Sequence, residues 1–364
     1  MATADATVPQ LSVVVPVRDG AAFLDRSLAA LAASDLPRSA WELIVVDDGS
    51  RDDSLAVAER YADRVLRQAT PSGPPAARNL GAAAARAPVV VFVDADVEVH
   101  ADALRKVRDA LADGSGLSAV FGAYDLSPAA PGLVSQYRNL LHSYVHRRDA
   151  GPAITFWTGL GGIRREVLEA AGGFDPGERL DDVELGYRLS GAGHRILLDP
   201  SITGSHLKRW TLWNLATTDV LYRGVPWVRL LVQGRQPLTH APLNLRGLDQ
   251  LLTVLMAVAL GLLVGGAVSG KGWLAAGGIG VLLAMGAVDW RLFRWLAVVR
   301  GWGFALAVAP LRMLYFTLNL LAVGLALLPV SWRRRVPVGR SGPADERAPA
   351  RGTAERQAGR ASVV

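Results

Sequence analysis

The segment VVVFVDADVEV, residues 89–99, runs from five apolar residues directly into Asp94 and Asp96. A short apolar run that is rich in β-branched residues predicts a buried strand. Two carboxylates at the end of such a strand suit a solvated turn, and they equally suit a site for a divalent cation. The segment by itself leaves both interpretations open, so the other predicted strands have to be considered.

Apolar strands alternate with helical segments along the first hundred residues. Strands are predicted at 11–17 (LSVVVPV) and 41–50 (WELIVVDDGS), and helices at 20–34, 50–64 and 75–87. This alternation predicts βαβ units and a mostly parallel sheet. Because open α/β sheets bind ligands at the carboxyl ends of their strands, we expect the polar residues at these ends to line a ligand site.

The middle of the chain continues the pattern less regularly. The segment ADALRKVRDALAD predicts a helix, SAVFGAYD a strand, and residues 156–175 a Gly-rich stretch followed by a helix. Residues 181–193 predict a helix whose acidic first turn suits the positive end of the helix dipole. In that helix Glu184 and Arg188 are spaced for an i,i+4 ion pair, which contributes about a few tenths of a kcal/mol.

Composition narrows the classes of chemistry. The chain has 364 residues, a formal net charge of +6 and no cysteine. The lack of cysteine excludes disulfides, thiolate metal sites and cysteine nucleophiles. The basic excess is carried by arginine and is given no chemical weight, so no nucleic-acid partner is expected. The first ten residues have neither a basic region nor a long apolar core, so we expect no secretory signal and a cytosolic location for residues 1–240.

Apolar residues are concentrated in the last third of the chain. The stretch 251–268 carries no charge and meets the length of about 17–25 residues that crosses a bilayer. The aromatic and Arg-rich stretch 289–302 predicts a helix that lies in the membrane interface. The candidate spans are 251–268, the shorter 272–288, and 304–330, which is interrupted by Pro310 and Arg312.

The number of crossings stays open between two and three. Three crossings would put the C-terminal tail outside, whereas Arg333, Arg334 and Arg335 favour the cytosolic side. The tail from 331 to 364 is charged and rich in Pro and Gly, which predicts disorder.

Four motifs resemble, in order and spacing, those of family 2 glycosyltransferases: SVVVPVRDG, LIVVDDGSRDDS, ARNLGAAAARAPVVVFVDAD and GGFDPGERLDDVELGYRLSGAG. The likeness covers about residues 11 to 212. It implies an α/β GT-A fold with a mixed, mostly parallel sheet, and a nucleotide-diphosphate sugar as donor.

The resemblance assigns the pair at the end of the opening segment to the donor. It implies that Asp96 binds Mg²⁺ or Mn²⁺, and that Asp94 binds the ribose, the water shell of the metal, or both. Carboxylate oxygens are the hard ligands that these cations prefer. A cation there neutralises charge on the departing diphosphate.

Further donor contacts follow from the same likeness. An Asp at position 47 or 48 would accept a hydrogen bond from the base, although an acidic helix N-cap explains the same residues and is compatible with that role. Pro16 and Arg18 stand where the family contacts the nucleotide, and Arg18 replaces the more usual small or polar residue. Arg78 corresponds to a position near the diphosphate, which a guanidinium fork fits well.

Acceptor chemistry is assigned to the third acidic element. Asp181 stands where the family has Glu, and the resemblance makes Asp182 the catalytic base that takes the proton of an acceptor hydroxyl. One base with metal-assisted departure implies single displacement with inversion. An acidic first helical turn is the structural alternative.

The segment GSHLKRWT partly matches the Gln-x-x-Arg-Trp motif of polymerising members. Arg209 and Trp210 fit the motif and His206 replaces Gln, which implies acceptor contacts; membrane-surface anchoring is the alternative. Gly161, within GLGG, would allow close approach of an acceptor, and a plain turn is its alternative.

These inferences predict a multi-pass protein of the inner or plasma membrane with a cytosolic, metal-dependent, inverting transferase domain and a lipid-linked or glycan acceptor. A processive synthase, a polyprenyl-phosphate sugar transferase and an inactive membrane scaffold are the alternatives. The predicted parts are a flexible start (1–10), a GT-A domain (11–240), a membrane domain (241–330) and a basic tail (331–364).

Overall fold

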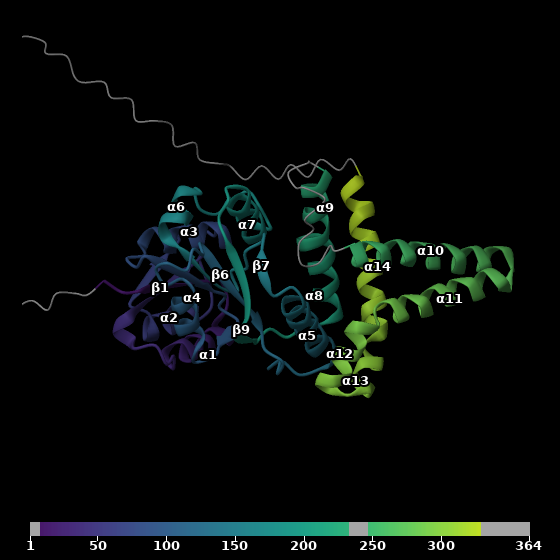
Figure 1. Ribbon diagram of the computed structural model, residues 1–364, viewed down its shortest axis with the longest axis horizontal. Coiled ribbons are helices and arrows are strands. Elements are labelled where there is room, and N and C mark those ends of the chain that lie inside the picture. The colour runs from purple at the N-terminus through teal and green to yellow at the C-terminus, as the bar shows by residue number, and fades with distance from the viewer. Residues whose placement is uncertain (1–7, 233–246, 329–364) are drawn as a thin grey trace, which may run out of the picture. The chain divides into compact units, whose positions relative to one another are not determined.

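The computed structural model describes residues 8–232 and 247–328, which belong to one compact unit and are shown in Figure 1. The predicted domain boundary at 240 and the predicted tail 331–364 lie outside the described residues. The predicted fold class is confirmed: an α/β domain with a mixed sheet is followed by apolar helices.

A nine-stranded sheet forms the centre of the described α/β domain, in the order β3-β2-β1-β4-β8-β6-β9-β5, with β7 paired to β9. Strands β1, β2, β3 and β4 pair in parallel, as the alternation of strands and helices predicts. Beyond β4 the sheet is largely antiparallel, so "mostly parallel" describes only its first half. The strands are β1 (Leu11–Val17), β2 (Trp41–Asp47), β3 (Arg64–Arg67), β4 (Val89–Val93), β5 (Val97–Val99), β6 (Ala119–Tyr124), β7 (Gly151–Ala153), β8 (Leu160–Arg164) and β9 (Ile196–His206).

Helices cover both faces of this sheet, which explains why its inner strands are apolar throughout rather than alternating. In β1, Leu11, Val13 and Val15 pack toward one layer of helices and Val14 toward the other, because successive side chains point to opposite faces. The first layer is α1 (Ala21–Ala32), α2 (Ser54–Tyr61) and α4 (Ala103–Ala110); the second is α3 (Pro74–Ala84), α6 (Arg165–Ala170) and α7 (Asp181–Gly191).

Four helical elements connect the sheet domain to the C-terminal helices. They are α5 (Leu133–Arg148), α8 (Leu212–Thr217), the π-helical turn η2 (Thr218–Gly224) and α9 (Val225–Val232); a short 3₁₀ turn, η1 (Arg38–Ala40), precedes β2. Leu140 and Leu141 of α5 pack with Leu292 and Leu296 of the C-terminal region. The η2 turn packs against α14 through Val220.

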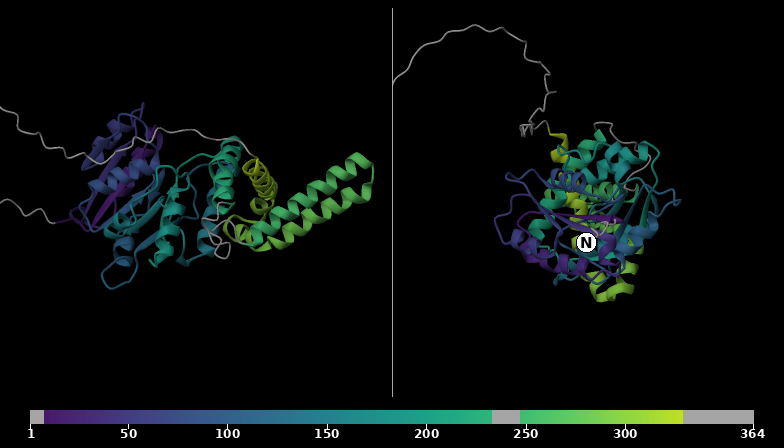
Figure 2. Two further views of the ribbon diagram at one scale, coloured as in Figure 1. Left: turned by 90° about the horizontal axis from the view of Figure 1, so that it is seen from above. Right: turned by 90° about the vertical axis from the view of Figure 1, so that its left-hand side faces the viewer.

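The C-terminal helices are α10 (Gly247–Ser269), α11 (Gly272–Val288), α12 (Trp290–Arg300), α13 (Trp302–Ala307) and α14 (Ala309–Leu327). Within the described residues, two stretches, Gly247–Ser269 and Trp302–Leu327, are long and apolar enough to cross a membrane. Helices α11 and α12, bent by 61°, make a third if the pair counts as one span. The expectation of two or three crossings therefore fits. Figure 2 shows α10 and α11 side by side as a hairpin.

The residues that interrupt the last predicted span are accommodated inside the protein. Pro310 is in the first turn of α14, where a missing N–H costs no intrahelical bond. Arg312 is buried: its Nε donates to Asp289 (2.6 Å) and its Nη2 donates to Asp249 (3.0 Å). Charged side chains within apolar helices are expected to pair in this way rather than face lipid.

Gly186 seats helix α7 on the sheet domain, and replacing it tests that packing. A Cβ at this position would lie 2.3 Å from the backbone nitrogen of Phe156, so Gly186→Ala has to push α7 outward. We expect a loss of about 1–3 kcal/mol in the free energy of unfolding, measured by denaturant titration.

Gly191→Ala, at the end of the same helix, is the matched control. Nothing lies within 4 Å of a Cβ there. Because alanine favours helix by up to about 1 kcal/mol over glycine, this variant is expected to be neutral or slightly more stable. Equal effects of the two substitutions would contradict the packing argument.

Candidate active site

Asp94 and Asp96 lie in the turn between β4 and β5. The backbone N–H of Asp94 donates to the carbonyl of Gly159 (3.2 Å), and the N–H of Val97 donates to the carbonyl of Asp94 (3.0 Å). Strand β4 is fully buried, whereas both carboxylates are only half-buried. The turn thus holds the two acids at the carboxyl end of the central strand, beside the ends of β1 and β2.

His206, at the end of β9, faces Asp96. Antiparallel pairing sets Val97 opposite His206, and the His206 Nε2 lies 3.3 Å from Asp96 Oδ2. On the other side of the ring, Nδ1 lies 2.8 Å from the Asn139 side-chain oxygen on α5. Burial acts to raise the pKa of Asp96, but the hydrogen bond and charge of His206, with Lys208, bring that pKa below its ordinary value. Asp96 is therefore a carboxylate at neutral pH.

The Asp96–His206 pair has the chemistry of a cation site. With Nδ1–H donated to Asn139 Oδ1, a cation would replace the Nε2 proton that His206 shares with Asp96, because imidazole nitrogen and carboxylate oxygen both bind Mn²⁺. In the part of the chain that the structure describes, no three His, Cys, Asp or Glu side chains converge as a complete metal site. A cation here would complete its shell with phosphate oxygens and water, as Mg²⁺ sites do.

Arg78 of α3 joins the acids of two distant segments. Its Nη1 donates to Asp181 Oδ2 (2.6 Å) and its Nη2 donates to Asp94 Oδ1 (3.1 Å). The guanidinium is buried, with 7% of the residue exposed. Arg78, which the sequence predicts near the diphosphate, thus bridges the end of β4 and the start of α7. It also lines the cavity, where a ligand can contact it.

Asp181 and Asp182 form the first turn of α7. Asp182 Oδ1 accepts from the N–H of Val183 (2.8 Å), and the side chain lines a cavity. Burial, with the negative charge of Asp181, raises the pKa of Asp182 to about 6, against the opposing charge of Arg78. Burial also raises the pKa of Asp181, against the pull of Arg78. Asp182 is therefore a carboxylate near neutral pH that binds a proton more readily than an ordinary Asp.

Asp47 and Asp48, at the end of β2, are both buried but differ in their partners. Asp48 accepts from the backbone N–H groups of Ser72 (2.6 Å) and Gly73 (2.9 Å), so both of its oxygens are engaged. Asp47 Oδ1 accepts from the N–H of Ser50 (3.0 Å), whereas its buried Oδ2 has no hydrogen-bond partner in the described residues. Arg67 Nε lies 3.7 Å from this oxygen, so the negative charge of Asp47 is offset while the hydrogen-bonding capacity of Oδ2 stays unused. An unsatisfied buried acceptor is costly, and an N–H of a ligand would satisfy it.

The end of β1 is tied to the loop after β2. Pro16 pairs in register with Val46, and the side chain of Asp19 accepts from the N–H of Arg51 (2.8 Å). Arg18 is about half-exposed, with its Nε 3.8 Å from Asp19. Its side chain is consequently available at the rim of the same edge of the sheet.

Sequence reasoning missed a cluster of imidazole and aromatic rings beneath the site. Tyr124 stacks on His206 (4.7 Å between centroids), and Trp157 packs edge-on against Tyr124, His142 and His146. Burial lowers the pKa of His142 well below its ordinary value and that of His146 to about 4, so both rings are neutral at pH 7. His142 and His146 are four residues apart on α5, so helical periodicity alone could have predicted that they share one face of the helix.

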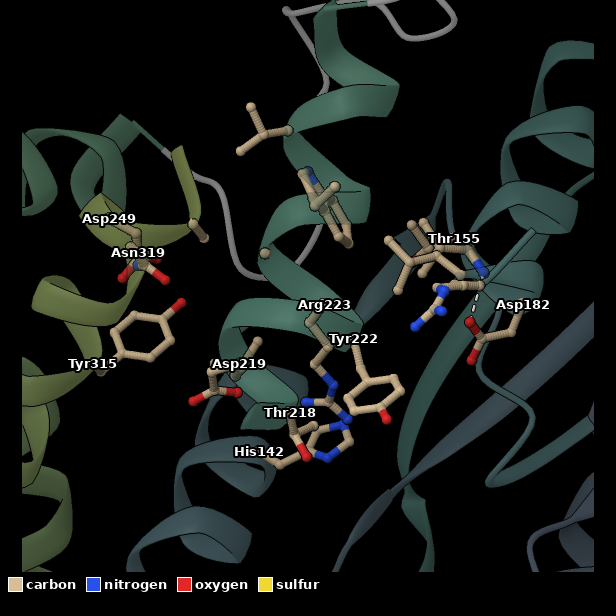
Figure 3. A pocket seen from close by; sticks show the side chains of 18 of the residues that line it. His142, Thr155, Asp182, Thr218, Asp219, Tyr222, Arg223, Asp249, Tyr315 and Asn319 are labelled. Carbon is tan, nitrogen blue, oxygen red and sulfur yellow. Dashed lines mark hydrogen bonds between the residues drawn. The ribbon is translucent and has the colours of Figure 1, made fainter. Parts of the chain in front are cut away.

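A cavity of about 800 Å³ connects the acids to the C-terminal helices. Arg78, Asp94 and Asp182 line one end, and residues of α9, α10 and α14 line the other. Figure 3 shows Asp182 across the cavity from His142, Tyr222 and Arg223. The ion pair between Arg138 of α5 and Asp219 of η2 (2.5 and 3.2 Å) lies in its wall.

Three residues expected to touch an acceptor are found elsewhere. Gly161 lies inside β8, where a Cβ would meet the Trp157 carbonyl at 2.4 Å, so its small size serves packing within the sheet rather than a turn or a binding surface. Trp210 is buried in a core cluster with Leu215 of α8, and is therefore neither a stacking platform nor a membrane anchor. Arg209 is exposed and is not among the residues that line the cavity. The match to the motif therefore did not predict that Trp210 is buried by packing.

The helix around Asp182 otherwise follows expectation. Arg188 Nε donates to Glu184 (2.7 Å), which confirms the predicted i,i+4 pair. Arg188 also donates to the carbonyl of Gly173 (2.7 Å), so this side chain fixes the loop before α7 as well.

Comparison with known proteins adds an independent line of evidence. Residues 12–172 match the model of glycosyl transferase family 2. The glycosyltransferase AglE of Haloferax volcanii is 24% identical over 215 residues, covering 56% of this chain and 68% of AglE. Validoxylamine A glucosyltransferase of Streptomyces hygroscopicus subsp. jinggangensis is 31% identical over 228 residues, covering 53% of this chain and 54% of the relative. The chain thus spans between about half and two thirds of the length of these relatives.

A solved structure is similar over more of the chain. The mannosyltransferase PcManGT from Pyrobaculum calidifontis, in complex with GDP-Man and Mn²⁺, superposes with a TM-score of 0.57 at 19% identity and covers 88% of both chains. At 19% sequence identity, this structural similarity supports the fold alone. Together, the family model that matches residues 12–172, the strand order and the likeness to PcManGT show a domain that resembles glycosyl transferase family 2 and has the GT-A fold.

Proposed function

We propose that this protein is an inverting, metal-dependent glycosyltransferase that moves a sugar from a nucleotide-diphosphate sugar to a lipid-linked or glycan acceptor. The observation that carries the proposal is the meeting of Asp94, Arg78 and Asp182, from three separate segments, on the wall of one cavity. That cavity continues to helices that are apolar enough to cross a membrane. We therefore propose a multi-pass protein of the cell membrane with its catalytic domain in the cytosol, where nucleotide sugars are made.

The donor is proposed to bind along the carboxyl ends of β1, β2 and β4. Asp47 Oδ2, which accepts no hydrogen bond from the described residues, suits an N–H of the base, and Asp48 shapes the site by holding the loop at Ser72 and Gly73. Asp94 lies next along the sheet and suits the ribose or the water shell of the cation. Pro16 and Arg18 flank the nucleotide at the end of β1.

The cation is proposed to bind at Asp96 and His206. Held by these two side chains, a divalent cation would supply Lewis-acid stabilisation of the negative charge on the departing diphosphate. PcManGT was solved with Mn²⁺, which supports the same type of cation here without choosing between Mn²⁺ and Mg²⁺. Asn139 orients the His206 ring from behind, a role that outer-shell partners of metal ligands usually serve.

Asp182 is proposed to act as the base. The acceptor hydroxyl loses its proton to Asp182 while its oxygen forms a bond to the anomeric carbon, and the bond from that carbon to the diphosphate breaks with the electron pair leaving on the diphosphate oxygen. A raised pKa makes Asp182 a better proton acceptor than an ordinary Asp. Arg78 and Asp181 hold the helix that carries it, and attack opposite the leaving group inverts the anomeric configuration.

Removal of the base tests this assignment. Asp182→Asn keeps the size of the side chain but cannot accept a proton, so we expect transfer to fall by roughly 10²–10⁴-fold with donor binding unchanged. Transfer is measured with radiolabelled donor, and donor binding by thermal shift. Asp113→Asn, at a fully exposed surface position, is the matched control. Full turnover of Asp182→Asn would point instead to an acceptor that is already ionised, such as a phosphate.

The pH dependence follows from the raised pKa of Asp182. The carboxyl is protonated below about pH 6 and cannot act as a base, so activity is expected to rise with pH through about 6 and then level off. The rise should disappear in the residual activity of Asp182→Asn. For stability the sign is opposite. The native state holds this proton to higher pH than the unfolded chain does, so the contribution of Asp182 to the free energy of unfolding falls as pH rises from about 4 to about 6.

A panel of nucleotide sugars identifies the donor. A donor in hundredfold excess over its dissociation constant stabilises the native state by about 2.7 kcal/mol. We expect a thermal shift for one nucleotide class, enhanced by Mn²⁺ or Mg²⁺ and reduced by EDTA. Asp96→Asn should abolish the metal enhancement, and Asp47→Asn should weaken binding of that base. The absence of any shift across the panel would refute the proposed donor class.

A further inference from the structure

The cavity extends well beyond the catalytic acids. Past Asp182 its wall is made by Tyr222 of η2 and Trp227 of α9, and then by Val254 of α10 and Val323 of α14. Helices α10 and α14 belong to the stretches that are long and apolar enough to cross a membrane. A ligand that fills this space meets polar groups at one end and apolar helices at the other.

Arg223 stands between these two ends. Its side chain lines the cavity, and Figure 3 shows it beside His142 and Tyr222, across from Asp182. The guanidinium forms no hydrogen bond or ion pair with any residue in 8–232 or 247–328. Burial and the nearby charge of Arg138 lower the pKa of Arg223, yet an arginine stays charged at neutral pH. Arg223 is exposed to the cavity, and no carboxylate in the described residues forms a direct ion pair with it, unlike its neighbours.

The neighbouring cations of the cavity wall are already paired. Arg78 bonds to Asp94 and Asp181, and Arg138 bonds to Asp219. Arg312 bonds to Asp249 and Asp289. Asp219, the acid on the same segment as Arg223, is thus engaged by Arg138, and the other acid that acts on Arg223 is Asp182 across the cavity. An anion brought by the ligand would supply the missing charge.

The segment that carries Arg223 is held rigidly. The π-helical turn η2 is clamped to α5 by the buried Arg138–Asp219 pair, and a Cβ at Gly224 would lie 2.5 Å from Ala322 of α14. Wide π-helical turns are uncommon and are often found at functional sites. Because the segment is fixed from both sides, Arg223 can bind an anion with little loss of backbone conformational freedom.

We propose that Arg223 binds the phosphate of a lipid diphosphate whose apolar chain lies along α9, α10 and α14. This proposal rests on the proposed transferase function and names its acceptor class. Asp182, Arg223 and the apolar helices follow one another along the cavity. The sugar hydroxyl, the diphosphate and the lipid follow one another in the same order in a lipid-linked sugar. A guanidinium fork suits phosphate, and the apolar helices suit the chain.

Binding is tested with the full-length protein in detergent, with its donor site filled by the nucleoside diphosphate and Mn²⁺ that gave the largest shift in the donor panel. The probes are farnesyl diphosphate, farnesol and inorganic diphosphate, followed by isothermal titration calorimetry. We expect farnesyl diphosphate to bind more tightly than either fragment. Arg223→Ala should weaken farnesyl diphosphate at least about tenfold, the loss typical of a charged hydrogen bond, and Arg223→Lys should restore part of it.

Arg294→Ala is the charge-matched control, because Arg294 is exposed on α12 and does not line the cavity. It should bind all three probes as the unaltered protein does. Binding of the nucleoside diphosphate should be unchanged in every variant, which separates this proposal from the transferase proposal. Equal binding of inorganic and farnesyl diphosphate, equal binding of farnesol, or an Arg223→Ala variant that binds donor and farnesyl diphosphate normally would each overturn the inference.

Discussion

The site depends on a buried guanidinium shared by two carboxylates. Arg78 is held by Asp94 from the end of β4 and by Asp181 from the start of α7, segments that lie far apart in sequence. A buried arginine without partners would be very costly, and so would either acid alone. The three charges are therefore stable only when the central strand, α3 and α7 adopt their present positions. This mutual dependence fixes the distance between the end of β4 and the first turn of α7, where we propose that donor and acceptor bind.

The same interaction sets the chemistry of Asp182. The two terminal nitrogens of Arg78 donate to Asp94 and Asp181, and among residues 8–232 and 247–328 Asp182 has a single hydrogen bond, from its own helix. Burial and the charge of Asp181 then outweigh the attraction of Arg78, and the pKa of Asp182 rises to about 6. Two adjacent acids thus take different roles: one completes a structural ion pair, while the other remains free to accept a proton.

A second buried cation organises the C-terminal helices. Arg312 of α14 joins Asp249 of α10 to Asp289 at the junction of α11 and α12. Since these charges are buried among apolar helices, separating any of them would leave an unpaired ion in an apolar environment. The far wall of the cavity, which α10 and α14 provide, is consequently positioned by ion pairs rather than by apolar packing alone, and its polar groups Tyr315 and Asn319 face the same space.

The sequence by itself determined the features that depend on local periodicity. The apolar strands, the helices between them, the acids at the strand ends and the apolar C-terminal stretches could all be predicted, because neighbouring residues specify them. Only the tertiary structure decided that Asp47 keeps an oxygen without a hydrogen bond in the described residues while Asp48 does not, that Gly161 and Trp210 are packing residues, and that Arg223 faces the cavity. The physical reason is sequence separation: the Arg78–Asp181 and Asp96–His206 contacts join residues 103 and 110 positions apart, and no local pattern encodes such a pairing.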